Sequence, residues 1–252
     1  MAKKILFLIV VALSLISILK MGNKENKTSV VEVDPISHAS IILNWDGVAI
    51  YADPSLYKVD KADAFTGKPD PDLILITDIH QDHFDVETIK SILKEKTIIV
   101  APSVVAEKIP KELNAMVFVM NNGEVAEHLG FKIEAIPMYN LPGPSESYHT
   151  KGRGNGYVIE KDGTRIYISG DTAGISEMRS LKDIDMAFVA MNLPYTMDVA
   201  EAALAVLEFK PKKVYPYHYR TPEGFSDVAK FKEIVNKENS EIEVVQLEWY
   251  SK

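Results

Sequence analysis

The chain has 252 residues, of which 46% are hydrophobic and 25% charged, a composition typical of one globular domain with a substantial core. Its formal net charge of -8 argues against sequence-independent binding to nucleic-acid phosphates, so no nucleic-acid partner is expected. The absence of cysteine excludes disulfides and thiolate metal ligands. Any metal ligand must therefore be His, Asp, Glu or Asn.

The first 20 residues differ from the rest of the chain. Lys3 and Lys4 precede the apolar run Ile5 to Leu19, a pattern typical of a signal peptide. The run is shorter than the roughly 20 residues of a spanning helix and shows no clear cleavage site, so a cleaved signal and a retained membrane anchor both stay open. A buried first helix is the third interpretation. We expect a polar linker over residues 21–29 and an exported protein, either periplasmic, extracellular or anchored to the outer face of the cytoplasmic membrane.

The folded domain is expected over residues 30–252, opening with a β-meander. The dipeptide Asp46-Gly47 favours a tight hairpin turn. Asp85 is placed to cap the helix after the apolar run that ends at Ile76. In this half we predict strands at Val31–Val33, Ile41–Trp45, Val48–Tyr51, Leu73–Ile76, Thr97–Ala101 and Val117–Met120, and helices at Val86–Leu93 and Ser103–Ile109.

The second half alternates strands and helices. Asp198 and Glu201 have the spacing of a capping box, and His128, in a polar stretch, is expected at the surface. We predict strands at Phe131–Ile136, Tyr157–Glu160, Arg165–Ser169, Met186–Ala190, Lys213–Tyr217 and Ile242–Leu247, and helices at Asp198–Phe209 and Ser226–Asn236. These elements predict an α+β fold of two mixed sheets with outer helices.

The densest chemical signal directly follows a buried strand. Asp78, His80, Asp82 and His83 lie within six residues. Side chains alternate in extended backbone, so the first three can share one face, and the turn into the next helix brings His83 round. A polar turn with capping aspartates is the alternative, but it would not need two histidines beside carboxylates.

This segment resembles the H-x-H-x-D-H motif of the metallo-β-lactamase superfamily, with Asp78 where the first His usually stands. Ser169-Gly-Asp-Thr172 resembles the superfamily's G-D-T element, in which Asp171 would bridge two metals. Tyr215-Pro-Tyr-His218 resembles its closing histidine at a strand end. The resemblance covers roughly Val30 to Lys252 and implies a four-layer αββα sandwich.

Within the superfamily the chain looks most similar to ascorbate-phosphate lactonases and N-acyl-phosphatidylethanolamine phospholipase D. The resemblance rests on Ser37-His-Ala-Ser40 before Ala52-Asp-Pro54. It implies that His38 lies near the metals or the substrate, whereas a hydrogen-bonded histidine in a turn is the alternative.

The third histidine of the family pattern has two candidates. Asn140 has the expected distance from the strand Phe131–Ile136, whereas His149 is chemically the better ligand and is favoured. Asn140 would then support the site from outside, or bind through its carbonyl oxygen. Nearby, Lys151 and Arg153 are either a solvated pair of charges or a receptor for phosphate or carboxylate.

The resemblance implies two divalent ions, one held by Asp78, His80 and His149 or Asn140, the other by Asp82, His83 and His218. Asp171 lies between them. A carboxylate at Asp78 favours manganese or iron over zinc without excluding zinc. Two ions about 3.5–4 Å apart would hold a bridging hydroxide as nucleophile. Asp82, Asp171 and His38 are the predicted catalytic residues.

The function predicted is hydrolysis of a phosphodiester or a lactone-type ester, from a small-molecule or lipid-like substrate. One alternative is a di-iron redox enzyme, because some members of the superfamily whose first-motif ligands are altered hold two iron ions. The other is a metal-binding scaffold without catalysis. The sequence does not predict the substrate or the oligomeric state, because fold alone does not imply function.

Overall fold

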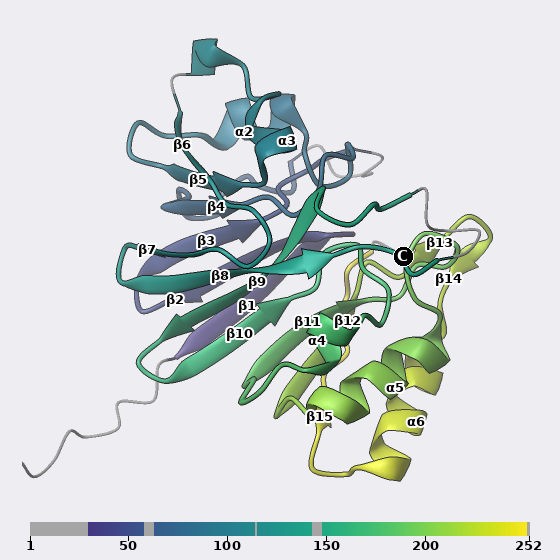
Figure 1. Cartoon of the computed structure of the whole chain (residues 1–252). Coiled ribbons are helices and arrows are strands. Elements are labelled where there is room, and N and C mark those ends of the chain that lie inside the picture. The colour runs from purple at the N-terminus through teal and green to yellow at the C-terminus, as the bar shows by residue number, and fades with distance from the viewer. Residues whose placement is uncertain (1–29, 58–62, 114, 143–147, 251–252) are drawn as a thin grey trace, which may run out of the picture.

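Two β-sheets packed face to face form the centre of the molecule (Figure 1). The computed structural model describes residues 30–57, 63–113, 115–142 and 148–250. The predicted export segment and the linker over residues 21–29 lie outside this part, so export stays a prediction. Among the described residues, no helix has both the length and the apolar character needed to cross a bilayer.

The first sheet follows chain order, β1-β2-β3-β4-β5-β6. Its first three strands are antiparallel and the rest are parallel. The predicted turn at Asp46-Gly47 is confirmed, with φ of 51° and 83°, values that suit a two-residue hairpin. The elements are β1 (Val31–Ser37), β2 (Ser40–Trp45), β3 (Val48–Ala52), β4 (Leu73–Leu75), α2 (Val86–Ile92), β5 (Ile98–Ala101), α3 (Ser103–Ala106), a 3-10 turn (Lys111–Leu113) and β6 (Met116–Val119).

The second sheet has the order β15-β12-β11-β10-β9-β8-β7. Strands β10, β11, β12 and β15 run parallel, and β7 to β10 are antiparallel neighbours. Its elements are β7 (Val125–His128), β8 (Phe131–Met138), β9 (Gly154–Lys161), β10 (Thr164–Ile168), α4 (Ser176–Arg179), β11 (Met186–Ala190), α5 (Val199–Phe209), β12 (Lys213–Tyr217), the short pair β13 (Arg220–Thr221) and β14 (Gly224–Phe225), α6 (Val228–Glu238) and β15 (Glu243–Val244).

Alternation along the strands divides the core into layers. On β2, Ile41, Leu43 and Trp45 face the second sheet, while Ile42 faces the layer that contains α2 and α3. A period of two is what a strand buried on both faces requires. A third cluster joins the outer face of the second sheet to α4, α5 and α6. The predicted four-layer αββα arrangement of two mixed sheets is therefore confirmed (Figure 1).

Helix caps agree with the sequence in part. The Asp85 carboxylate accepts the N–H of Glu87, and Asp198 accepts the N–H of Glu201 at 2.7 Å. The Glu201 carboxylate, however, accepts the N–H of Gly174 at 2.9 Å. That bond ties α5 to the loop after β10.

Some predicted boundaries were wrong. The polar stretch around His128 contains strand β7, an edge strand whose Val125 is exposed, so it lacks an alternating apolar signal. His128 is partly buried, with its ring 4.4 Å from that of Phe118.

The predicted helix at Ser103–Ile109 ends at Ala106, ahead of Ile109-Pro110, because a residue before proline disfavours helix. The predicted strand at Ile242–Leu247 is reduced to β15.

The aromatic cluster between the sheets should dominate stability. Phe188 is fully buried, with ring centroids 4.8 Å from Tyr215 and 6.4 Å from Trp249. We predict that Phe188→Ala lowers the free energy of unfolding by about 3–5 kcal/mol. Leu204→Ala, on the exposed side of α5, is the control and should change it by less than about 0.5 kcal/mol. Chemical denaturation measures both, and equal effects would contradict this layering of the core.

Candidate metal centre

Six of the predicted ligands converge at one end of the sandwich because each of them follows the end of a strand. Asp78, His80, Asp82 and His83 follow β4, Asp171 follows β10, and His218 follows β12. Gly170 has φ of +59°, and an added Cβ would lie 2.6 Å from Met138 Sδ and 3.0 Å from Thr77 Cβ. Glycine therefore allows the turn that aims Asp171 into the site.

One half of the centre combines Asp78, His80 and His149, which offer ligand atoms within 4.8 Å of one another. Asp78 Oδ2 lies 2.7 Å from His80 Nδ1 and 3.8 Å from His149 Nε2. Asp78 and His149 are buried, whereas the His80 side chain is 42% exposed. Of the two candidates for the third histidine, the structure thus brings His149 to the other ligands.

The other half combines His83, Asp171 and His218, all buried. The Nε2 atoms of His83 and His218 lie 3.2 Å apart. Asp82 Oδ2 is 3.5 Å from His218 Nε2 and closes this half towards the pocket.

Asp171 spans the two halves with its two oxygens. Oδ1 is 3.3 Å from Nε2 of both His83 and His218, and Oδ2 is 3.2 Å from His149 Nε2. A carboxylate in this position can give one oxygen to each of two ions.

The donor atoms fit divalent cations. His149 Nε2 and Asp171 Oδ1 are buried and make no hydrogen bond among the described residues. Buried polar atoms normally have partners, so two such atoms in one cluster of possible ligands fit the binding of a cation. Nitrogen and carboxylate oxygen are ligands suited to zinc and manganese.

Each buried histidine is held through its other ring nitrogen, which leaves Nε2 for the centre. His83 Nδ1 donates to Asp53 Oδ2 at 2.8 Å, and Asp53 also accepts the N–H and hydroxyl of Thr77 at 2.7 and 2.6 Å. Sequence reasoning quoted Asp53 only as part of a motif and missed this function. The one signal was the Asp-Pro pair at the end of the hairpin.

Asn140 contacts the ring of His149 in this geometry. Its Oδ1 accepts the N–H of His149 Nδ1 at 2.8 Å, and its Nδ2 donates to the Tyr195 carbonyl at 2.8 Å. The side chain is therefore used in orienting His149. Support from outside the centre was the alternative that the sequence left open.

Asn192 plays the same part for His218, and the sequence missed it. Its amide nitrogen lies 3.0 Å from His218 Nδ1, and its Oδ1 is buried with no hydrogen-bond partner in the described part of the chain. If the Asn192 amide is turned over, its Oδ1 accepts a hydrogen bond from Nδ1–H of His218. The Nε2 atom of His218 then stays free of a proton and can bind a metal.

His38 lies beside the centre. The backbone N–H of Arg220 donates to the Tyr250 hydroxyl at 3.1 Å. Because the hydroxyl oxygen accepts that bond, its own hydrogen can be donated to His38 Nδ1, which lies 2.7 Å away. His38 then carries its ring hydrogen on Nε2, which faces Asp82 Oδ2 at 3.2 Å. Burial and the neighbouring His218 lower the pKa of His38 to about 4, so its ring is neutral at pH 7.

Three turns around the centre contain a residue with left-handed backbone. His38, Asp53 and His218 have φ of 51°, 46° and 47°, in the left-handed region that such residues seldom adopt. The N–H of His218 donates to the His38 carbonyl at 3.2 Å and so ties two of these turns together. Strain of this kind gathers at functional sites.

Charge is balanced inside the cluster. Burial alone would raise the pKa of Asp171, but His218 and His83 hold it well below its ordinary range. Burial would lower the pKa of His83, but the carboxylates of Asp171 and Asp53 raise it well above its ordinary value. His83 and Asp171 therefore each favour the charged form of the other.

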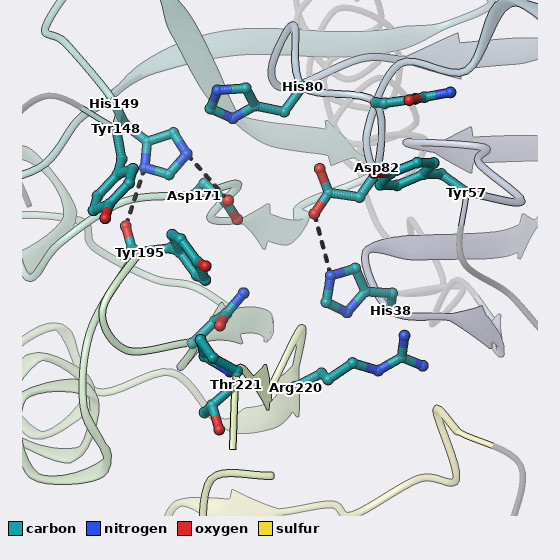
Figure 2. A pocket seen from close by; sticks show the side chains of 13 residues that line it. His38, Tyr57, His80, Asp82, Tyr148, His149, Asp171, Tyr195, Arg220 and Thr221 are labelled. Carbon is teal, nitrogen blue, oxygen red and sulfur yellow. Dashed lines mark hydrogen bonds and ion pairs between the residues drawn. The ribbon is translucent and has the colours of Figure 1, made fainter. Parts of the chain in front are cut away.

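A pocket of about 420 Å³ opens onto these residues (Figure 2). His38, His80, Asp82, His149 and Asp171 reach it from both sheets. Its outer wall is formed largely by Tyr57, Tyr148, Tyr195, Arg220 and Thr221.

Comparison with known proteins agrees with this geometry. The profile of a beta-lactamase superfamily domain matches residues 32–218. A UPF0173 metal-dependent hydrolase of Thermococcus onnurineus is 34% identical over 191 residues, which are 74% of this chain and 84% of the relative. A crystal structure assigned to a metal-dependent hydrolase of Parabacteroides distasonis is 38% identical, with a TM-score of 0.77, and the match covers 87% of this chain and 94% of that one.

A more distant structure supports the fold alone. Igni18, a metallo hydrolase from Ignicoccus hospitalis, is 24% identical, with a TM-score of 0.73 over 88% of this chain and 96% of its own. Together with the profile match and the ligand cluster at the strand ends, these likenesses show that the chain belongs to the metallo-β-lactamase superfamily, among its metal-dependent hydrolases.

Proposed function

We propose that the protein uses two divalent ions to hydrolyse a phosphodiester or a lactone-type ester. The observation that carries this proposal is the position of Asp171, with one oxygen towards His83 and His218 and the other towards His149. The relatives are described as metal-dependent hydrolases, which favours hydrolysis over redox chemistry or a scaffold without catalysis.

The two halves of the cluster define the ligands. Asp78, His80 and His149 would hold one zinc or manganese ion, and Asp82, His83 and His218 the other, with Asp171 shared. Such ions supply Lewis acidity and make a water acidic enough to attack at neutral pH.

The chain's own residues set the geometry. Asp53, Asn140 and Asn192 fix the rings of His83, His149 and His218. His38 faces Asp82 with a neutral imidazole, which keeps the Asp82 carboxylate oriented and leaves His38 beside the pocket. We propose that His38 and Asp82 steer protons at the substrate side of the centre.

The pocket fits a small ester or the head of a lipid-like one. Its tyrosines offer apolar ring faces, and Arg220 adds a cation that suits a phosphate or carboxylate group. Metal analysis of purified protein, combined with a panel of phosphodiesters, lactones and thioesters, tests the proposal. Fully folded protein that takes up no added metal would overturn it.

Asp171 should affect turnover more than folding. Asp171→Asn keeps the size of the side chain but loses the charge that can serve both halves, so we predict a loss in kcat of about a hundredfold or more. Steady-state kinetics on a substrate from the panel measures it. Asp162→Asn, in the turn between β9 and β10, is the control and should be silent. Wild-type turnover in Asp171→Asn would contradict the shared ligand.

Asp53 should control metal affinity from outside the pocket. Asp53→Asn removes the charged acceptor that holds His83 Nδ1, so divalent-ion affinity should fall by about 10–100-fold. Titration of chelator-treated protein with zinc, against a competing indicator, measures the change. An unaltered dissociation constant in a folded variant would show that Asp53 does not orient this ligand.

Metal binding should release protons. The metal-free pKa of His83 is raised, so below that pKa an entering ion must displace a proton. Affinity should therefore rise with pH, by up to about tenfold per unit for one proton. Titrations at pH 6, 7 and 8, with proton release followed in weak buffer, measure this dependence. Constant affinity without proton release would refute it.

A further inference from the structure

Arg153 binds Asp78, the aspartate that stands where the family motif has its first histidine. Its Nε donates to Asp78 Oδ1 and its Nη2 to Asp78 Oδ2, both at 3.2 Å. Asp78 is fully buried, and the Arg153 side chain is 22% exposed. This is the two-point geometry in which guanidinium binds carboxylate most strongly.

The same guanidinium reaches the segment that carries the third histidine. Arg153 Nη2 donates to the Tyr148 carbonyl at 2.5 Å, directly before His149. The Arg153 side chain therefore links Asp78, in the loop after β4, to the segment that leads into β9. Arg153 is not among the residues that line the pocket, so it acts through these neighbours rather than on substrate.

Lys151 and Arg153 do not form the solvated pair that the sequence allowed. Lys151 points outward and binds Glu177 Oε1 at 2.8 Å. Arg153 turns inward to Asp78. The two positions thus have separate functions, and Lys151 provides a matched control two residues away.

The charges of Asp78 and Arg153 compensate each other. Aspartate where the family motif has a neutral imidazole adds one negative charge in a buried place, and a buried charge without a partner is costly. Guanidinium stays protonated at any ordinary pH and adds one positive charge. The pair therefore restores the net charge that a histidine would give this half of the centre.

We propose that Asp78 and Arg153 work as one unit, in which Arg153 is a positioning residue that makes an aspartate usable as a ligand and fixes the His149 segment. The inference rests on the proposed metal centre. It predicts that the identity of residue 78 cannot be changed independently of residue 153. Histidine at 78 beside Arg153 would leave a guanidinium facing the metal with no carboxylate between them.

A double-mutant cycle tests the unit through metal affinity, without any substrate. Asp78→His should weaken the affinity for one of the two ions by about tenfold or more. Asp78→His combined with Arg153→Met should regain most of that affinity, because the uncompensated cation is removed. Calorimetric titration of chelator-treated full-length protein with zinc, then manganese, measures each site. Lys151→Met should leave both affinities unchanged.

Thermal unfolding of the metal-free proteins gives a second readout. Arg153→Met alone removes the permanent cation from the buried Asp78 carboxylate and leaves it only histidine partners, so it should lower Tm, while the double variant should unfold at a higher temperature than Arg153→Met. Asp78→His binding as tightly as wild type, or a double variant no better than either single variant in both measurements, would overturn the inference. Wild-type protein that binds no metal would instead remove the proposed function on which it rests.

Discussion

The whole site depends on one constraint, that carboxylates taken out of water must face cations. Asp53, Asp78 and Asp171 are buried at one end of the sandwich. Histidines face all three of these carboxylates, and Arg153 also faces Asp78. The carboxylates of Asp53 and Asp171 raise the pKa of His83 between them and so favour its charged form. Metal ions would compete with a proton on His83, so the same residues serve folding and binding.

The sheet arrangement brings these charges together. Loops after β4 of one sheet and after β10 and β12 of the other meet at the same edge, above a core that both sheets share. Apolar burial between the sheets stabilises this meeting and offsets the left-handed backbone at His38, Asp53 and His218. The strain is therefore tolerated where three turns must aim side chains at one point.

The sequence predicted the layers and most ligand candidates because their signals are local. Asp78 to His83 are nearly contiguous, and Asp171 and His218 each follow a recognisable apolar strand. Asp53, Asn192 and Arg153 were not predictable in this way. Each acts through a contact across many residues, Arg153 to Asp78 across 75 of them, and each lies in a loop beside the end of a strand. The edge strand β7 escaped for a related reason, since its exposed residues lack a two-residue period.

The third histidine shows how a local distance rule fails. Asn140 has the expected spacing from β8, but His149, nine residues further along the chain, lies beside it, with Nδ1 2.8 Å from Asn140 Oδ1. Asn140 then holds the ring of His149, whose Nε2 lies near Asp78 and Asp171. Arg153 also changes the argument about metal preference. A carboxylate at Asp78 was expected to favour manganese or iron through both charge and hardness, yet the guanidinium offsets the charge. What remains is the harder oxygen donor, so any preference over zinc must come from donor chemistry and coordination geometry.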